Sequence, residues 1–296
     1  MTRTTATGAH PLDHLVLPTQ SLDVARARLT TLGFVVAPTG VHPFGTENCC
    51  VFLADGTYLE PLAVGDSQAA TTAIAEGNVF VARDRIYRDN RGDEGFSAMV
   101  LSTGNADADH ARYLEAGISA GDTLSFSRAF TDPAGKSDVA SFKLAFAAGA
   151  KATDAFLFAC ERVNAPDVDR AALQAHANGA TGIVEIVAVS DQPAEQHGLI
   201  SVAVDNPTTD SRGGTFHLPN ADLSVLDPAS FTARFGLPAG APTDLRFAAV
   251  VFSVRSADVT SRLLAANSIQ HDIAGNDIVV RPAPGQGAAF IFREIP

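Results

Sequence analysis

Four segments of the chain repeat one order of apolar and polar positions. Each starts with a short run of strand-forming apolar residues, crosses a polar break, and continues as a stretch whose apolar residues recur at helical spacing. The helical stretches begin close to Ser, Asn or Asp, the residues that cap helix N-termini. The apolar runs begin near Leu15, Met99, Ile186 and Val250. A pattern that returns along the chain indicates a repeated structural unit.

Shorter strand-like runs follow each predicted helix. In the first segment they are "GFVVAP", "NCCVFLADG" and "TYLEPLAV", and the pair Asp55-Gly56 is typical of a tight hairpin turn. The second and fourth segments show a similar succession. The third is the least regular, with "GTFHLP" and "DLSVLDP" as its clearest strands. The pattern therefore predicts four β-α-β-β-β units.

We expect the four units to pair into two halves of an α+β fold. One such unit cannot cover both faces of its own sheet, but two units side by side form a curved mixed sheet around a cleft, with helices outside. The first half is predicted at residues 1–165, with units at 1–65 and 94–165 and a helical insertion at 66–93. A polar linker at 166–179 leads to the second half at 180–296, with units at 180–240 and 241–296.

Composition and charge restrict the partners of the protein. Hydrophobic residues make up 46% of the chain and charged residues 18%, which is typical of a globular protein with a buried core. The net charge of −12 disfavours binding to nucleic acid or to an anionic membrane surface. No run approaches the ~20 apolar residues of a membrane span. The N-terminus has no apolar signal-peptide core, so we expect a cytoplasmic protein. We further expect it to be a monomer or homodimer that binds a small molecule.

Two polar residues interrupt strand-like apolar runs in the first unit. His14 lies in "HPLDHLVLPT" and Glu60 in "TYLEPLAV", where an unpaired carboxylate would be costly to bury. They are either a hydrogen-bonded pair in the core or two side chains of a functional cleft. The repeat counterparts of His14 are two alanines and a glutamate, Ala98, Ala249 and Glu185. Small residues favour a position beside open space, so we predict that His14 and Glu60 face the first cleft together.

Further candidates lie on the neighbouring predicted strands. The stretch "HPFGTEN" offers His42, Thr46 and Asn48, either as ligand contacts or as loop residues that bond the backbone. Arg128 alternates with apolar residues in "LSFSRAF" and is either a surface arginine or an inward one that binds an anionic substrate group through two hydrogen bonds. The three cysteines form no CxxC pair, and the chain contains no nucleotide-binding glycine motif.

The first unit, "LDHLVLPTQSLDVARARLTTLGFVVAPTGVHPFGTENCCVFLADGTYLEPLAV", resembles the vicinal oxygen chelate superfamily. This superfamily includes glyoxalases, bleomycin-resistance proteins and extradiol dioxygenases, and the closer resemblance is to glyoxalase-like domain proteins. The stretches "ACERVNAP" and "HANGATGI" add to the likeness. The resemblance implies the same paired-unit fold. It also implies a divalent metal (Zn, Fe, Mn or Ni), held by His or Glu on the first strand and Glu on the last strand of two paired units.

The implied metal ligands are only partly present. In the first half His14 and Glu60 match the pattern, but the second unit has Ala98 at the position of His14 and Phe158 or Cys160 at that of Glu60. In the second half Glu185 and Glu294 are weaker candidates, because Ala249 cannot ligate. An extradiol dioxygenase would keep two His and one Glu in that half, so this activity is not expected.

The resemblance therefore favours a metal-dependent enzyme, a lyase, isomerase or oxygenase, that acts on a small oxygenated and possibly anionic metabolite. Glu60 and Arg128 are the predicted catalytic residues, and His14 and Glu60 the predicted metal ligands. The predicted substrate contacts are His42, Thr46, Asn48, Arg128 and Cys160. The alternative is a non-catalytic binding protein of the bleomycin-resistance type with a degenerate metal site, which the missing second-unit histidine favours.

Overall fold

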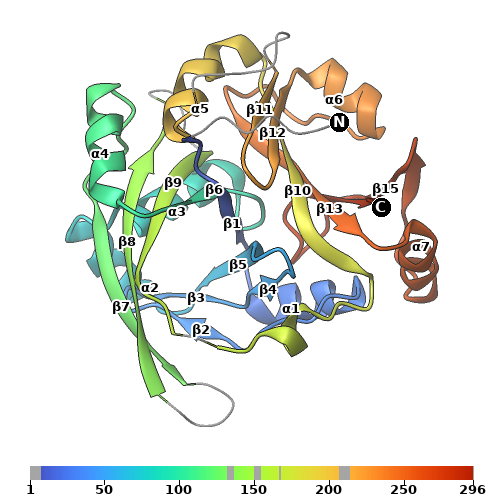
Figure 1. Cartoon of the computed structure of the whole chain (residues 1–296), viewed down its shortest axis with the longest axis horizontal. Coiled ribbons are helices and arrows are strands. Elements are labelled where there is room, and N and C mark those ends of the chain that lie inside the picture. Colours follow the sequence, from blue (N-terminus) through green and yellow to red (C-terminus); the bar gives the residue numbers. More distant parts are fainter. Residues whose placement is uncertain (1–7, 132–136, 150–154, 167, 207–213, 296) are drawn as a thin grey trace.

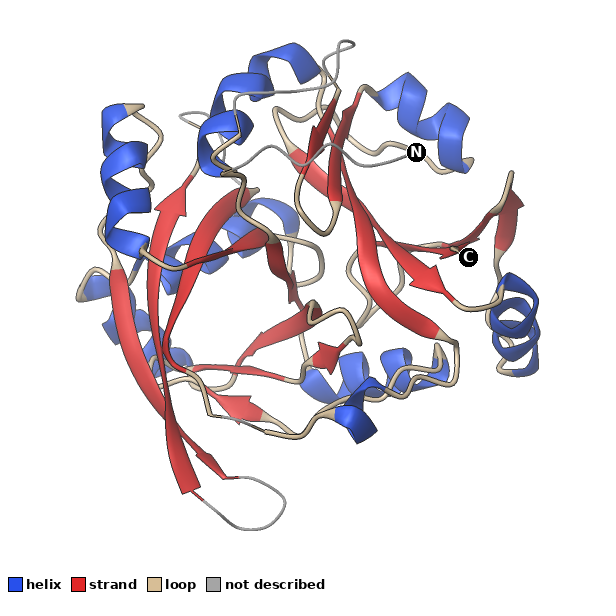
Figure 2. Ribbon diagram, viewed as in Figure 1, coloured by secondary structure: helices blue, strands red, loops and turns tan. Residues whose placement is uncertain are grey.

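A computed structural model describes residues 8–131, 137–149, 155–166, 168–206 and 214–295. Its strands form two curved mixed sheets, and helices cover their outer faces (Figures 1 and 2). The predicted α+β fold of paired units is confirmed, because each sheet is built from two consecutive units. The predicted unit boundaries stay predictions.

The first sheet has β1 at its centre. β1 (Leu12–Pro18) pairs in parallel with β5 (Tyr58–Val64) and antiparallel with β6 (Ala98–Thr103). The sheet order is β2-β3-β5-β1-β6-β9-β8-β7, and β4 also pairs with β5. The other strands of this sheet are β2 (Gly40–Val41), β3 (Thr46–Asn48), β4 (Val51–Phe52), β7 (Leu124–Thr131), β8 (Ser137–Ala147) and β9 (Phe156–Asn164).

The second sheet repeats this plan with the order β11-β12-β10-β13-β16-β15-β14. Its third unit differs from the prediction, because two strands rather than three follow its helix in the part of the chain that the structure describes. The strands are β10 (Ala180–Val189), β11 (Thr215–His217), β12 (Asp222–Leu226), β13 (Arg246–Val254), β14 (Asp272–Ala274), β15 (Asp277–Val280) and β16 (Ala289–Glu294).

The helices begin largely where the sequence predicts them. Ser256 caps α7 through its side chain, and Asn105 caps α4 in the same way. The insertion between the first two units folds into two helices, α2 and α3. The helices are α1 (Leu22–Thr31), α2 (Ser67–Ala75), α3 (Val79–Arg91), α4 (Ala106–Glu115), α5 (His197–Ala203), α6 (Pro228–Phe235) and α7 (Ala257–Ala266), with 3-10 turns η1 (Ala171–Gln174) and η2 (Pro193–Gln196).

One apolar core joins the two halves. It contains Leu15 and Leu17 of β1 together with Ile183 and Ile186 of β10. Phe34, which follows α1, packs on three phenylalanines of the second half, at ring-centroid distances of 5.3 to 6.1 Å. The halves therefore support each other through buried apolar contacts rather than through a loose linker.

The corresponding faces of the two sheets are filled differently. In the second sheet, Val187, Ala249 and Val251 pack against Phe231 and Phe235, which α6 contributes. The equivalent face of the first sheet packs in part against α2 and α3 but also lines a pocket. The two halves therefore differ on this face, because α6 places two phenylalanine rings on the second sheet.

Candidate functional site

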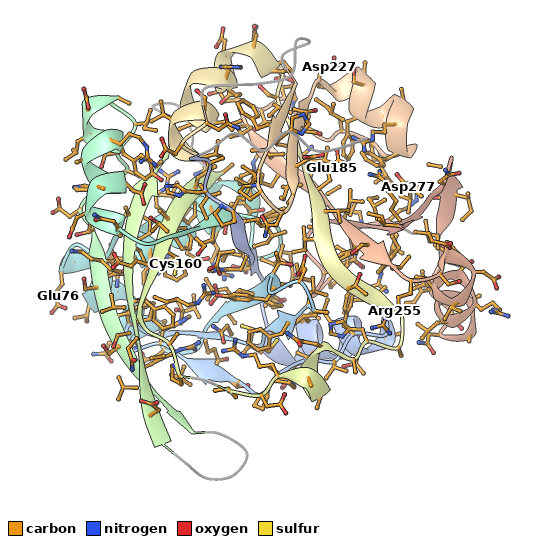
Figure 3. The ribbon with its side chains drawn as sticks, viewed as in Figure 1. Glu76, Cys160, Glu185, Asp227, Arg255 and Asp277 are labelled. Atoms are coloured by element: carbon orange, nitrogen blue, oxygen red, sulfur yellow. The ribbon has the colours of Figure 1, made fainter. Side chains whose placement is uncertain are left out.

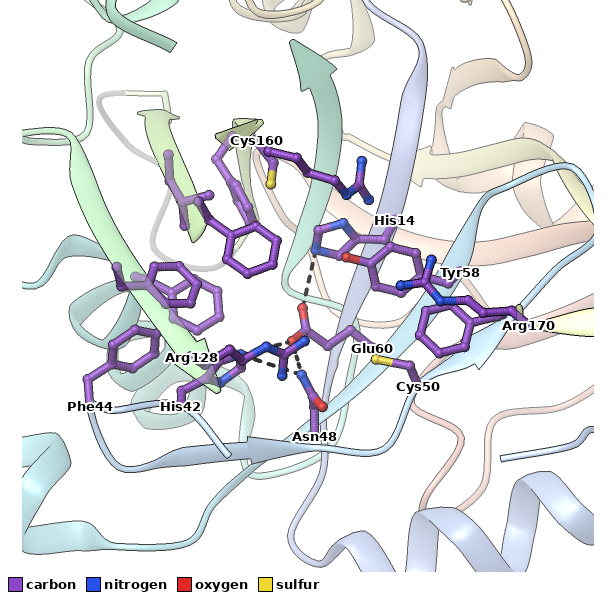
Figure 4. A pocket seen from close by; sticks show the side chains of 17 residues that line it. His14, His42, Phe44, Asn48, Cys50, Tyr58, Glu60, Arg128, Cys160 and Arg170 are labelled. Atoms are coloured by element: carbon purple, nitrogen blue, oxygen red, sulfur yellow. Dashed lines mark hydrogen bonds and ion pairs between the residues drawn. The ribbon is translucent and has the colours of Figure 1, made fainter. Parts of the chain in front are cut away.

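A pocket opens on the first sheet, with a cavity volume of about 90 Å³ (Figure 4). Its wall is mainly aromatic, and polar side chains meet on one side. The aromatic residues are Phe44, Phe52, Tyr58, Phe80, Phe126, Phe142 and Phe158, and the polar ones include His14, His42, Asn48, Glu60, Arg128, Arg162 and Arg170. An apolar pocket with a few convergent polar groups is the usual form of a small-molecule site.

The side-chain alternation of β1 breaks at Asp13. Leu15 and Leu17 face the core between the halves, whereas Val16 belongs to the pocket-side cluster. Alternation would put Leu12 beside His14, yet Leu12 packs with Leu15. The pairing with β6 explains this, because the register shifts between Leu12 and His14 and leaves Asp13 as the extra residue of a β-bulge.

The bulge brings two consecutive side chains into one hydrogen-bonded chain. His14 Nδ1 lies 2.7 Å from Asp13 Oδ1, and His14 Nε2 lies 3.2 Å from Glu60 Oε2. The His14 ring stacks on Tyr58 with centroids 4.3 Å apart. On the far side, Arg162 of β9 binds both oxygens of Asp13, at 2.5 and 2.7 Å. The structure thus places His14 and Glu60 together in the pocket, as the strand pattern predicts, whereas their role in function stays a prediction.

The surroundings fix the charges of this chain. Burial would raise the pKa of Glu60, but the hydrogen bonds and charges of His14, His42 and Asn48 lower it to about 2. Burial would lower the pKa of His14, but Asp13 and Glu60 together raise it. The pKa of Asp13 is likewise held below its usual range by His14 and Arg162, against the effect of burial. These contacts therefore favour the charged forms of Asp13, Glu60 and His14.

His42 and Asn48 form a second, uncharged arm on Glu60. Asn48 Nδ2 donates to Glu60 Oε1 at 2.6 Å, and His42 Nε2 lies 3.6 Å from the same oxygen. Burial lowers the pKa of His42 to about 4, although Glu60 acts in the opposite direction. Thr46 is fully buried and bonds His42 Nδ1 at 2.9 Å, and it does not line the pocket. Thr46 therefore supports His42, and its role as a substrate contact stays a prediction.

Arg128 reaches the pocket from β7 across the open side of the sheet. A Cβ atom at Gly40 would lie 2.6 Å from both Arg128 Nη1 and Asn48 Oδ1, so the glycine leaves room for the guanidinium. Arg128 also lies over the Phe142 ring at 5.8 Å. Among the described residues, no hydrogen bond or ion pair neutralises this arginine. Arg128 is thus a cation in the pocket that pairs with no carboxylate of the described residues.

Among the charged groups at the pocket, sequence reasoning missed Asp13, which contacts His14, and the lining residues Arg162 and Arg170. Asp13 is adjacent to His14 in sequence, but alternation would have put it on the opposite face. Arg162 and Arg170 lie in a stretch that the sequence analysis treated as strand end and linker, and Arg170 covers the Phe52 ring at 4.6 Å. Cys160 lines the pocket as predicted, and burial raises its thiol pKa well above the usual range. It is a neutral wall residue rather than a nucleophile.

Comparison with known proteins identifies the family. A family model described as a glyoxalase-like domain matches residues 12–202. This chain belongs to the glyoxalase-like domain family. That assignment agrees with the vicinal oxygen chelate superfamily indicated by the first unit. A comparison with curated proteins gives no match.

Solved structures share the fold of this glyoxalase-like protein. A hypothetical protein from Staphylococcus aureus superposes with a TM-score of 0.63 at 13% identity, over 96% of this chain and 99% of that chain. A mutant of 4-hydroxymandelate synthase from Streptomyces coelicolor gives a TM-score of 0.59 at 12% identity, over 97% of this chain and 93% of that chain. At these identities the likeness concerns the fold alone. No helix in the described part of the chain has the length and apolar character to cross a membrane.

The second half of the glyoxalase-like protein uses its acidic candidates for structure. Glu185, labelled in Figure 3, lies on β10 of the second sheet. It binds Arg234 of α6 at 2.6 and 2.7 Å and accepts a hydrogen bond from Ser224. Arg293 adds a contact of 3.2 Å and also binds Asp277. Glu185 is therefore neutralised in an ion-pair network, and its role as a metal ligand stays a prediction.

Glu294 is not the counterpart of Glu60. Val16 pairs with Glu60, and the equivalent Val251 pairs with Ile291, three residues before Glu294. Glu294 Oε2 instead accepts a hydrogen bond from Ala257 N, at the start of α7. It is thus a helix-capping carboxylate, and its role as a metal ligand stays a prediction. The same register argument assigns Phe158, paired with Val100, as the counterpart of Glu60 in the second unit.

The first pocket has too few metal-ligating side chains for a complete metal site. His14 and Glu60 suit a divalent cation, and the bond from Asp13 to His14 Nδ1 resembles the support that metal-bound histidines receive. Among the described residues, however, no group of three or more His, Cys, Asp or Glu side chains could hold a metal ion. Catalytic zinc sites usually have three protein ligands. The residues present therefore do not fit a tightly held metal.

Proposed function

We propose that this protein is an enzyme that binds a small oxygenated anion in the first pocket and transfers a proton on it. One juxtaposition carries the proposal: the buried chain Asp13–His14–Glu60 shares an aromatic pocket with Arg128, which has no ionic partner among the described residues. Together these groups offer charge recognition and proton transfer.

The charge balance favours an anionic ligand. Three arginines line the pocket, Arg128, Arg162 and Arg170, whereas its hydrogen-bonded chain contains two carboxylates, those of Asp13 and Glu60, so positive groups outnumber negative ones. A guanidinium binds a carboxylate through two parallel hydrogen bonds, and this interaction is stronger in a pocket from which water is displaced. The aromatic wall would hold the apolar part of the same ligand. The supported ligand class is a small carboxylate or similar anion with an apolar group.

The His14–Glu60 pair supports acid–base chemistry. In the free protein the proton lies on His14 and Glu60 is a weak base, because their contact stabilises both charges. A ligand oxygen that takes the place of Glu60 as acceptor of the His14 Nε2 proton would be polarised. Glu60 would then lose this hydrogen bond and become a stronger base. Proton transfer beside a polarised carbonyl is a step of isomerase and lyase reactions.

The metal-dependent form of this function stays a prediction, with His14 and Glu60 as the ligands. A divalent ion would act as a Lewis acid toward a substrate oxygen when bound, but two protein donors do not complete such a site. We therefore assign the proton transfer to the side chains. Metal analysis of protein purified without chelators tests this assignment. A stoichiometric metal ion that is lost in His14→Ala would contradict this assignment and support the metal-dependent form. A metal content well below stoichiometric supports the assignment.

Proton transfer is tested by solvent exchange. A panel of small 2-oxo and 2-hydroxy carboxylic acids is incubated with the protein in D₂O, and loss of the carbon-bound proton is followed by NMR. We expect the wild type to exchange the carbon-bound proton of at least one acid. The exchange rate should fall about 100-fold or more in Glu60→Gln, and Arg128→Gln should bind benzoate more weakly. The surface variant Arg262→Gln is the matched control, because Arg262 pairs with Asp258 in solvent.

A second candidate is ligand binding without turnover. It is favoured by the second unit, which places Ala98 and Phe158 where the first unit has His14 and Glu60. Benzoate binding that depends on Arg128, with no exchange in the whole panel, would support this candidate and contradict the enzymatic proposal.

A further inference from the structure

A side chain of the second half holds the backbone of β1 next to the pocket. Leu12 N donates to Asn220 Oδ1 at 2.8 Å, and Asn220 Nδ2 donates to Leu12 O at 2.9 Å. Both backbone polar groups of one residue are thus bound by one amide. Asn220 is far away in sequence, between β11 and β12, so this contact ties the second half to the strand that carries His14.

The need for this amide follows from the strand pairing. β5 begins at Tyr58, which lies opposite His14, so β5 does not extend as far as Leu12. Leu12 is 3% exposed, and buried backbone groups without partners are costly. The Asn220 amide offers one donor and one acceptor and takes the place of the absent strand neighbour.

The residue that Asn220 holds is directly next to the β-bulge. The register with β6 shifts between Leu12 and His14, and the extra residue is Asp13. This shift allows Asp13 to reach His14 Nδ1 instead of pointing to the opposite face. The position of the Leu12 backbone therefore determines whether Asp13 and His14 remain in contact.

The turn that presents Asn220 is itself fixed. Leu218 N donates to Ala221 O at 2.8 Å, and both of these residues are buried. Asn206 Nδ2 donates to His217 O on the preceding strand. The amide is thus held by a tight, packed turn and can restrain β1.

We propose that Asn220 is a positioning residue of the first pocket. By binding Leu12 it holds the bulge, keeps Asp13 on His14, and makes the second half part of a site whose polar side chains all come from the first half and the linker. Its effect on turnover rests on the proposed proton transfer. Its effect on the geometry of Asp13 and His14 does not.

The test uses Asn220→Ala in the full chain. In the wild type, NMR should show a protected Leu12 amide and an observable His14 Nδ1 proton. In Asn220→Ala we expect Leu12 amide exchange to accelerate at least tenfold and the His14 Nδ1 signal to broaden or disappear. Deuterium exchange of the substrate acid should fall about tenfold, while benzoate affinity changes less than twofold, because Arg128 is untouched. If the wild type shows no substrate exchange, the two NMR signals still decide the positioning role.

Two further variants keep the result interpretable. Asn267→Ala is the matched control, since Asn267 Nδ2 also bonds a first-half carbonyl, Thr31 O, at 2.8 Å but lies away from β1. Asn220→Asp keeps the acceptor for Leu12 N and loses the donor, so it should give an intermediate effect and serves if the alanine variant does not fold. Unchanged Leu12 and His14 signals in a folded Asn220 variant, or an equal loss in Asn267→Ala, would overturn the proposal.

Discussion

Replacing His42 by glutamine should make the stability of this protein less sensitive to acid. His42 is 6% exposed and its ring is packed by Phe44 at 5.0 Å. Burial lowers its pKa from 6.5 to about 4. The unfolded chain therefore binds a proton at this residue between pH 6.5 and 4, whereas the folded chain does not. The contribution of neutral His42 to the free energy of unfolding is therefore complete above pH 6.5 and decreases as the pH falls toward 4.

The size of this effect follows from the two pKa values. A change from 6.5 to about 4, at ~1.36 kcal/mol per unit, corresponds to a loss of about 3 kcal/mol. Glutamine does not titrate in this range and keeps a polar group toward Asn48. Glu60, with its pKa lowered to about 2, contributes stability that is lost only below pH 4.5, at the lower end of the range tested.

The assay is urea unfolding of the wild type and His42→Gln, followed by circular dichroism from pH 7 to pH 4.5. On going to lower pH, the wild type should lose stability relative to the variant, by more than 2 kcal/mol at pH 4.5 and approaching the full ~3 kcal/mol near pH 4. Groups that titrate equally in both proteins cancel in this difference. Parallel pH curves would refute the reasoning, because they would mean that His42 is protonated as easily in the folded chain as in the unfolded one.

Three other variants test separate parts of the structure. Gly40→Val should weaken benzoate binding at least tenfold in calorimetry, because its Cβ would displace Arg128, whereas Gly104→Ala, with open space around its Cβ, should bind normally. Equal affinities would place the anion elsewhere. Glu185→Gln should lower the free energy of unfolding by about 2 kcal/mol, because buried arginine contacts lose their counter-charge, with benzoate affinity unchanged. A loss of binding would instead implicate the second half. Glu294→Gln should cost less than about 1 kcal/mol in thermal unfolding, because it weakens only a helix cap, and a larger loss would contradict that assignment.

The repeat in the sequence was sufficient to predict the fold. Strand beginnings near Leu15, Met99, Ile186 and Val250 fall within β1, β6, β10 and β13, because alternation and helical spacing are local properties of the chain. It was also predictable that His14 and Glu60 lie on the same face of the sheet, because the pairing of a unit's first and last strands sets their register.

The parts that sequence reasoning missed depend on contacts between distant residues. The role of Asp13 required the bulge in β1, which local alternation does not reveal. The packing of Phe231 onto the second sheet depends on α6. The same helix supplies Arg234, which together with Arg293 pairs with Glu185. Glu294 is not at the position that corresponds to Glu60, because that position on β16 is Ile291, three residues earlier in the chain.

The central claim is that the first pocket, with Arg128 beside the Asp13–His14–Glu60 chain, is where this protein binds its ligand. Amide chemical-shift mapping with benzoate and the neutral benzyl alcohol tests it most directly. We predict benzoate-dependent shifts confined to β1, β5 and β7 around the pocket, much weaker shifts with benzyl alcohol, and loss of the benzoate shifts in Arg128→Gln. Shifts centred on Glu185 in the second half, or equal shifts with both compounds, would contradict the account.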